Sequence, residues 1–356
     1  MTTKHQQFDR LIAGNTSGTN VLGRFFLVLL ILTGTSIFAA AQQRYTVARP
    51  ITTSAVPFQG EEAEKEGEKE EVKTPRFVPQ NTAPIRWETD YQYAMKTAER
   101  STLYLLIYLY ADDKSELPEV LADVPVVSGC REFSTVVLDD DFVRAGLAKY
   151  VALKLPMDAK VIGEEGVAVP IYSLPGFEHM LELPGLVVID FAHRDTPHYG
   201  EVVGILPFLR GESPTPEQTE TFLNLPPGTL TQRTLTYAVR IHPDRPLSGD
   251  GVALPIVMKA ATDHATYQAE RGILGHFNFG TRSNRVREAL GGGSPSEICA
   301  QTRNDESLFE AALSCMRLWR HSSGHWSIAK KSQRYFGYDM VRSKNGSWYG
   351  VGFFIN

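Results

Sequence analysis

The sequence predicts an α/β fold with two domains. Leu103 to Ala111 (LYLLIYLYA) is a continuous apolar run, typical of a strand buried on both faces. Segments with helical spacing alternate with such strands up to Leu225, and this alternation indicates an α/β domain. Two further strands close the chain around Asn345-Gly346, the dipeptide typical of a tight hairpin. The length of 356 residues favours two domains plus tails.

The N-terminal part of the chain predicts export. Basic residues precede an apolar run from Phe25 to Ala41, which ends in small alanines of the kind that a signal peptidase accepts. We therefore expect residues 1–41 to be a signal peptide or an uncleaved signal anchor, because the run is barely long enough to span a bilayer. The expected location is periplasmic or extracellular, with membrane anchoring through residues 25–41 as the alternative to cleavage.

Residues 42–84 are expected to be a disordered acidic linker, since they hold few large apolar residues and several prolines. The run from Glu61 to Glu71 contains seven glutamates and two lysines, which account for the whole net charge of −5. The rest of the chain then balances at 34 basic and 34 acidic residues. No basic face is implied, so nucleic-acid binding has no electrostatic support.

The cysteines do not form a recognisable framework. The chain has three, Cys130, Cys299 and Cys315, which is few for an exported protein, and it contains no CxxC motif. Cys299 with Cys315 is the one pairing that the sequence favours, and the sequence does not decide whether that bond forms.

Residues 85–226 resemble the thioredoxin-like fold in the order of their elements. A Trp-led helix at Trp87–Ser101 precedes the apolar strand, and a helix opening on Cys130-x-x-Phe133 follows it. A proline, Pro184, then stands before the next apolar strand. The resemblance implies that Pro184 is a cis-proline that faces a redox position.

By the same resemblance, Cys130 occupies the second cysteine position of the redox pair and Val127 occupies the first. Dithiol exchange begins with a low-pKa thiolate at the start of the helix. With valine at that place, we expect a redox-inactive domain. A thiol oxidoreductase acting through Cys130 alone is the alternative.

Residues 227–356 resemble the CAP superfamily, the SCP-like cysteine-rich secretory and pathogenesis-related proteins, in its bacterial form. Five strings carry the resemblance, and they occur in the order of the family: HATYQA, GHFNFGTR, SEICA, AALSCMRLWRHSSGHWSIA and FGYDMVRSKNGSWYGVGFF. Their concurrence is far more specific than any single motif. The resemblance implies a CAP-type α/β/α sandwich.

In that family histidine and glutamate side chains meet in a central cleft. Carried over by position, they are His276, Glu297 and His325. The sequence departs from the family at Ile298, where an asparagine is usual, and at Ser322, where the eukaryotic form has a second cleft glutamate. We therefore expect these three residues, with Ser322, to line the cleft.

Two imidazoles and a carboxylate could act in either of two ways. They can hold a divalent metal such as zinc through His276, Glu297 and His325, with a coordination position left open. Without a metal, Glu297 can hydrogen-bond both imidazoles and fix the loops that carry them.

We expect an exported cell-envelope binding or scaffolding protein. Its cleft is expected to bind a small apolar ligand, a divalent metal or an envelope protein partner. The alternative is a metal-dependent hydrolase, with His276 and His325 as ligands and Glu297 as general base. Binding is favoured because no general catalytic reaction is assigned to the family.

The remaining histidines are expected to be structural. His321 lies four residues before His325, but no HExxH pattern connects them, and a new helix is expected to start at Ser322 or Ser323. His321 is therefore expected to be a surface or capping residue. We expect His264 to be a packed, hydrogen-bonded histidine on its helix. For His193 and His198, in a turn between two strands, we expect exposure to solvent.

Overall fold

The computed structural model describes residues 84–163 and 166–356, and these residues fall within one compact unit. The expected signal or anchor at residues 1–41 and nearly all of the expected linker lie outside the described residues. In the part that is described, no helix combines the length and the apolar character needed to cross a membrane.

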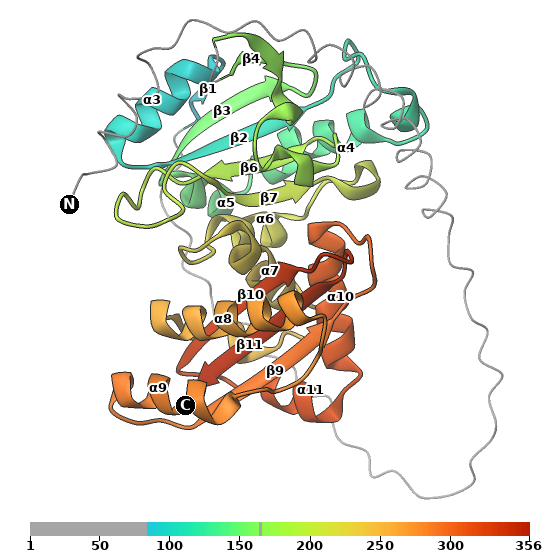
Figure 1. Ribbon diagram of the computed structural model, residues 1–356. Helices are drawn as coiled ribbons and strands as arrows, with labels where there is room; N and C mark the ends of the chain where they lie inside the picture. The colour runs from blue at the N-terminus through green and yellow to red at the C-terminus, as the bar shows by residue number, and fades with distance from the viewer. Residues whose placement is uncertain (1–83, 164–165) are drawn as a thin grey trace, which may run out of the picture. The chain divides into compact units, whose positions relative to one another are not determined.

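The first half of the described chain forms a five-stranded mixed sheet (Figure 1). In spatial order its strands are β1 (Trp87–Glu88), β3 (Tyr150–Pro156), β2 (Tyr104–Tyr110), β6 (Gly185–Ile189) and β7 (Val202–Pro207). The first three are parallel to one another, whereas β6 and β7 each run antiparallel to their neighbour. A short antiparallel pair, β4 (Lys160–Ile162) and β5 (Ala168–Pro170), stands apart from this sheet.

Helices cover both faces of the five-stranded sheet. The helices are α3 (Tyr91–Ser101), α4 (Val126–Glu132), α5 (Asp141–Leu147) and α6 (Pro216–Leu223). Helix α3 packs with Leu105 and Ile107 of β2, while α4, α5 and α6 pack with Leu106 and Tyr108 of the same strand. Because β2 is covered on both sides, every residue in its interior is apolar or aromatic.

Local sequence sets where these helices begin. The Asp90 side chain accepts a hydrogen bond from the Tyr93 amide at 2.7 Å and starts α3. Thr215 and Gln218 form a reciprocal capping box at the start of α6, with Pro216 at its first position. The Thr215-Pro216 pair is thus a local signal for the start of this helix.

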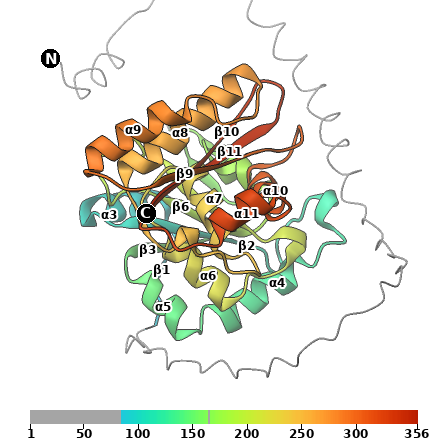
Figure 2. The same cartoon turned by 90° about the horizontal axis from the view of Figure 1, so that it is seen from below.

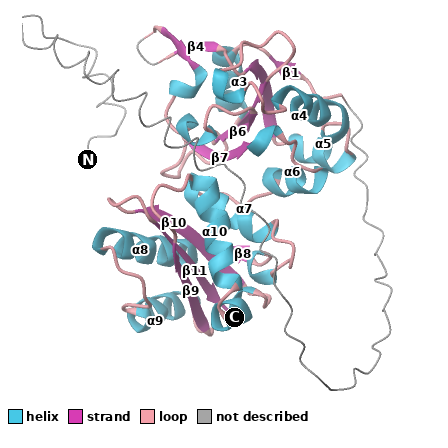
Figure 3. Ribbon diagram, turned by 90° about the vertical axis from the view of Figure 1, so that its right-hand side faces the viewer, coloured by secondary structure: helices cyan, strands magenta, loops and turns pink. Residues whose placement is uncertain are grey.

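The second half forms a four-stranded sheet with helices on both faces, as Figures 2 and 3 show. Its strands, in spatial order, are β8 (Val252–Ala253), β10 (Tyr335–Arg342), β11 (Trp348–Ile355) and β9 (Pro295–Gln301). One face carries α8 (Pro255–Arg271) and α9 (Phe279–Leu290). The other carries α7 (Leu230–Arg240), α10 (Leu308–Arg320) and α11 (Ser323–Ala329).

Strand alternation assigns each side chain of this sheet to one face. In β11, Trp348 and Phe354 pack with α7 and α10, whereas Val351 and Phe353 pack with α8 and α9. Gly337 of β10 is necessary for this packing, because a Cβ atom there would lie 2.5 Å from the Met258 backbone of α8. The alternation also decides which residues of β9 can share a site.

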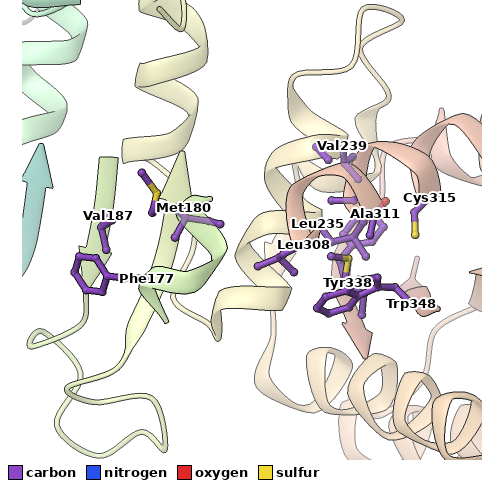
Figure 4. Close-up of a cluster of buried hydrophobic side chains, with 14 of the residues drawn as sticks. Phe177, Met180, Val187, Leu235, Val239, Leu308, Ala311, Cys315, Tyr338 and Trp348 are labelled. Carbon is purple, nitrogen blue, oxygen red and sulfur yellow. The ribbon is translucent and has the colours of Figure 1, made fainter. Parts of the chain in front are cut away.

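Helix α7 contacts both sheets. Its neighbours include β7 of the first sheet and β10 of the second. Leu235 and Val239 of α7 belong to one buried cluster with residues of both halves, including Phe177 and Val187 from the first and Tyr338 from the second (Figure 4). The two sheets are therefore joined by continuous apolar packing.

Two expectations about the first half need correction. Helix α4 begins at Val126, four residues before Cys130, so the helix does not open on that cysteine. The described residues contain no cis peptide bond, so the expected cis-proline at Pro184 is wrong. Left-handed backbone at Leu181 and Glu182, with Gly185 at φ 150°, makes the turn into β6 without it.

In the second half, Ser307 caps α10 with a capping box to Glu310 and so sets the first residue of that helix. The structure also decides the Cys299–Cys315 pairing, which the sequence left open. The three described cysteines are free thiols. Cys299 packs on the α8 face of the sheet and Cys315 on the α10 face, so the backbone separates the two sulfur atoms.

Candidate functional site

Glu297 is the centre of a polar cluster on the α8 face of the second sheet. It pairs with Phe353 across β9 and β11, and its side chain is 1% exposed. Its Oε1 atom lies 3.0 Å from Nδ1 of His276. Its Oε2 atom accepts two hydrogen bonds from Arg282, from Nε at 3.2 Å and from Nη2 at 2.7 Å. Both carboxylate oxygens are therefore engaged.

The loop that carries His276 is held from two sides. His264 of α8 donates from Nε2 to the Gly275 carbonyl at 2.7 Å, and the Gly275 amide donates to Gln268 Oε1 at 3.0 Å. From the other side, Arg282 Nη1 donates to the Phe277 carbonyl at 2.5 Å. These bonds fix the backbone on each side of His276, so that its ring is aimed at Glu297.

His264 is fully buried, and its Nε2 lies 3.5 Å from Glu297 Oε1. Burial lowers the pKa of His264, and this outweighs the opposite effect of Glu297. The hydrogen bond to a carbonyl places the proton on Nε2, while Nδ1 is buried with no hydrogen-bond partner. The expected packed, hydrogen-bonded role of His264 is confirmed, and the residue also belongs to the site.

His325 approaches His276 rather than Glu297. The two ring centroids lie 5.7 Å apart at an interplanar angle of 58°. Burial lowers the pKa of His325, and the neighbouring His276 lowers it further. Among the described residues, the ion-pair partners of Glu297 are His264, His276 and Arg282. The three expected residues thus form a chain, Glu297 to His276 to His325, rather than a mutual triad.

In the segment from Trp319 to Ser327, the expected capping role of His321 and the expected start of a new helix are both confirmed. His321 is the C-cap residue of α10, and its ring Nδ1 donates to the Arg317 carbonyl at 2.7 Å. Helix α11 begins at Ser323 with Ser322 at its N-cap position, so a new helix does separate His321 from His325. Ser322 is half-buried at this junction, and its carbonyl accepts from the Trp326 amide.

The loop that carries His276 also exposes apolar side chains close to it in the sequence. Ile273, Leu274 and Phe277 are 38%, 47% and 40% exposed, and the His276 side chain is 47% exposed. The Phe277 ring lies 6.1 Å from that of Tyr267, which Arg271 covers at 4.1 Å. We call Ile273, Leu274 and Phe277 the apolar rim. A half-exposed imidazole among exposed apolar side chains can orient an amphiphilic molecule.

Sequence reasoning missed two members of the cluster. Arg282 is the last residue of the GHFNFGTR string, but nothing in the local sequence indicates that its guanidinium contacts Glu297. Cys299 stands two residues after Glu297 and therefore on the same face of β9, with Sγ 3.6 Å from His276 Nδ1. The period of a strand could have identified Cys299 once SEICA was assigned to β9.

Two groups of described residues bring three possible ligand atoms within 4.8 Å of one another and could hold a metal ion. The first is His264, Glu297 and Cys299. The atoms that would bind the metal are already engaged. Arg282 balances the charge of Glu297, and His264 Nε2 carries the proton that it donates to the Gly275 carbonyl. Burial also raises the pKa of Cys299 well above its ordinary value, which favours the neutral thiol. These residues fit a hydrogen-bonded cluster better than a metal centre.

The second group is Asp190, His193 and His198, in the turn between β6 and β7. The expectation of solvent exposure for these histidines is wrong. Their side chains are 32% and 12% exposed, and both rings approach the buried carboxylate of Asp190.

Cys130 is unsuited to thiol exchange. It is buried within α4, and the Ala111 amide donates to its sulfur at 3.3 Å. Burial raises the pKa of the Cys130 thiol, and this outweighs the opposite effect of the Ala111 hydrogen bond. Val127 is half-buried one turn earlier, and the carbonyl of Pro184 is occupied by the Phe208 amide at 2.8 Å.

No protein-family model matches the sequence, and no curated protein matches it. What the chain can do is therefore argued from the geometry of its own residues.

Proposed function

We propose that the protein is an exported cell-envelope binding protein whose second half binds a small amphiphile at His276. The observation that carries the proposal is the hydrogen bond between His276 Nδ1 and Glu297. A carboxylate accepts, so Nδ1 holds the proton and Nε2 is left as an acceptor. The ligand would be an apolar molecule with a hydroxyl or amine group that donates to Nε2, its apolar part lying on the rim.

The strand orders support the two fold resemblances behind this proposal. The order β1-β3-β2-β6-β7, with three parallel strands followed by two antiparallel ones, is that expected of a thioredoxin-like domain. The antiparallel core of β10, β11 and β9 between two helical layers agrees with a CAP-type α/β/α sandwich. We propose these families for residues 85–226 and 227–356, with the first domain redox-inactive.

A hydrolase is a weaker proposal. A general base must reach the proton that it abstracts. Glu297 is buried, with Oε1 engaged by His276 and Oε2 engaged twice by Arg282. This arrangement suits a residue that positions His276 rather than one that activates water.

Titration with a fluorescent long-chain fatty alcohol tests the binding proposal. We expect saturable binding by the full chain, weakened by His276→Ala and by Phe277→Ala. Leu318→Ala is the matched control, because Leu318 is 46% exposed on α10 and lies outside the rim. Equal affinity for all four proteins, or no saturation, would contradict the proposal.

A further inference from the structure

The turn between β6 and β7 brings two imidazole rings to one carboxylate oxygen. Asp190 follows β6 directly, and its side chain is 1% exposed. Its Oδ2 atom lies 3.0 Å from Nδ1 of His193 and 3.3 Å from Nε2 of His198. All three residues come from one short turn, so their arrangement depends on local structure.

The two oxygens of Asp190 have different roles. Oδ1 accepts hydrogen bonds from the amides of Ala192 at 2.8 Å and His193 at 3.1 Å, which fixes the start of the turn. Oδ2 faces both imidazole nitrogens, and the proton on His193 Nδ1 is shared between Oδ2 at 3.0 Å and Oδ1 at 3.1 Å. The Asp190 backbone is also paired at both its amide and its carbonyl, with Glu201 and Gly200 respectively. The turn is therefore held in place independently of the side chains that approach Oδ2.

A shift in strand register contributes to this geometry. The pairing of β6 with β7 is irregular between Val188 and Ile189, immediately before Asp190. Such bulges redirect the side chains that follow them. Here the irregularity precedes the point where the Asp190 carboxylate turns toward the two histidines.

The distances agree with those of a tetrahedral zinc site. Zinc binds imidazole nitrogen and carboxylate oxygen at about 2.0–2.2 Å, so neighbouring ligand atoms lie about 3.3 Å apart. The two measured distances to Oδ2 are 3.0 and 3.3 Å, and the three ligand atoms lie within 4.8 Å of one another. Among the described residues, no partner meets hydrogen-bond geometry for the buried Nε2 of His198, although this atom lies 3.3 Å from Oδ2.

The charge of this group suits a divalent cation. Among the described residues, His193 and His198 are the ion-pair partners of Asp190, whereas Glu297 is paired with an arginine. The nearby buried cation, Arg233, lies over the Tyr104 ring and donates to the carbonyls of Leu225 and Pro226. The Asp190 carboxylate is therefore paired, among the described residues, with imidazoles rather than with a lysine or arginine, and a zinc ion would replace the proton on His193 Nδ1.

We propose that Asp190, His193 and His198 form a zinc-binding site with one coordination position left for water. Solvent can reach this site, since His193 is 32% exposed. His198 also lines a surface hollow of about 340 Å³ together with Pro197, Glu201 and Thr229. The site is separate from His276 and does not depend on the proposed amphiphile binding.

The test uses the full chain after removal of metal with a chelator. Zinc affinity is measured by calorimetry, and cobalt(II) is added separately to report tetrahedral coordination through its visible absorption. We expect one equivalent of zinc to bind wild-type protein. We expect His193→Ala and His198→Ala each to weaken that binding at least about 10-fold, the scale of effect seen even for residues behind the ligands.

Two variants serve as controls. His179→Ala removes a histidine outside the turn, and His276→Ala removes the histidine at the other candidate site; both should keep wild-type zinc affinity. The test relies on the histidine variants, because a substitution of Asp190 would also disturb the turn that its side chain fixes. Circular dichroism checks that the histidine variants are folded. Absence of zinc binding by wild type, or undiminished binding by a folded His193→Ala/His198→Ala double variant, would overturn the proposal.

Discussion

Arg282 donates two hydrogen bonds to the same oxygen of Glu297, at 3.2 and 2.7 Å, inside the second half of the protein. The Arg282 and Glu297 side chains are 9% and 1% exposed. The pair joins α9 to the edge strand β9 and leaves the other oxygen of Glu297 for His276. The Arg282 ion pair and the orientation of His276 therefore depend on the same carboxylate.

Replacement of Arg282 by methionine should be strongly destabilising. It would leave the Glu297 carboxylate buried without its cation, a change that typically costs about 3–5 kcal/mol. Urea unfolding of Arg282→Met measures the loss. Arg285→Met is the matched control, since Arg285 forms an exposed pair with Asp263 and should lose at most about 1 kcal/mol. Similar losses in both variants would argue against the buried pair.

His264 should make the fold sensitive to mild acid. Burial lowers its pKa below the ordinary 6.5, so the folded state binds fewer protons than the unfolded state. The contribution of neutral His264 to the free energy of unfolding is therefore lost as pH falls below about 6.5. His264→Gln keeps a donor for the Gly275 carbonyl but does not titrate. We expect a shallower loss of unfolding free energy below that pH in the variant, and parallel curves would contradict this.

Asp339 should make stability fall as pH rises, whereas His264 makes it fall as pH decreases. It is buried in β10, and burial raises its pKa above the ordinary 3.8 despite hydrogen bonds from Thr231 and Thr262. The folded state then binds more protons, so stability falls as pH rises from about 3.8 through the raised folded pKa. Asp339→Asn should lose less stability over this window. If the free energy of unfolding of Asp339→Asn fell with pH as steeply as that of wild type, Asp339 would be charged over this whole pH window.

The Thr262 hydroxyl can also pair with a protonated Asp339. The hydroxyl of Thr262 lies 3.1 Å from the Met258 carbonyl and 2.5 Å from Asp339 Oδ2. It has one proton to donate. If that proton goes to the carbonyl, a protonated Asp339 can donate to Thr262 in return.

The three thiols should resist modification in the native protein. All are buried, and burial raises the pKa of Cys130 and raises that of Cys315 to about 12. Reaction with Ellman's reagent should be slow for folded protein and should reach three thiols after denaturation. Rapid modification of Cys130, lost in Cys130→Ser, would instead favour the thiol oxidoreductase.

Much of the fold could be predicted because its signals are local. Thr215 is the N-cap of α6, and Gly272 ends α8 in the left-handed conformation, the positions that these residue types favour. The strand β9 was missed because SEICAQ is short and mixes polar with apolar residues, and only its place beside β11 explains its burial. Local periodicity was thus sufficient for most elements but not for β9, which only its pairing with β11 identifies.

The candidate site was predicted less completely because its contacts are tertiary. Glu297 and His276 were identified through a family resemblance and do lie 3.0 Å apart. The contact between Arg282 and Glu297 depends on how α9 packs on the sheet. His193 and His198 were assigned to solvent because a polar turn is usually exposed, whereas Asp190 draws both rings inward.

Nitrogen-15 NMR of the histidine rings, recorded while a long-chain fatty alcohol is added, tests the role of His276 most directly. We predict a proton on Nδ1 of His276 and a shift of its Nε2 resonance on binding, with His179 and His321 unchanged. An Nε2 resonance that stays constant at saturating alcohol, or a proton already on Nε2 in the free protein, would contradict the proposed binding mode.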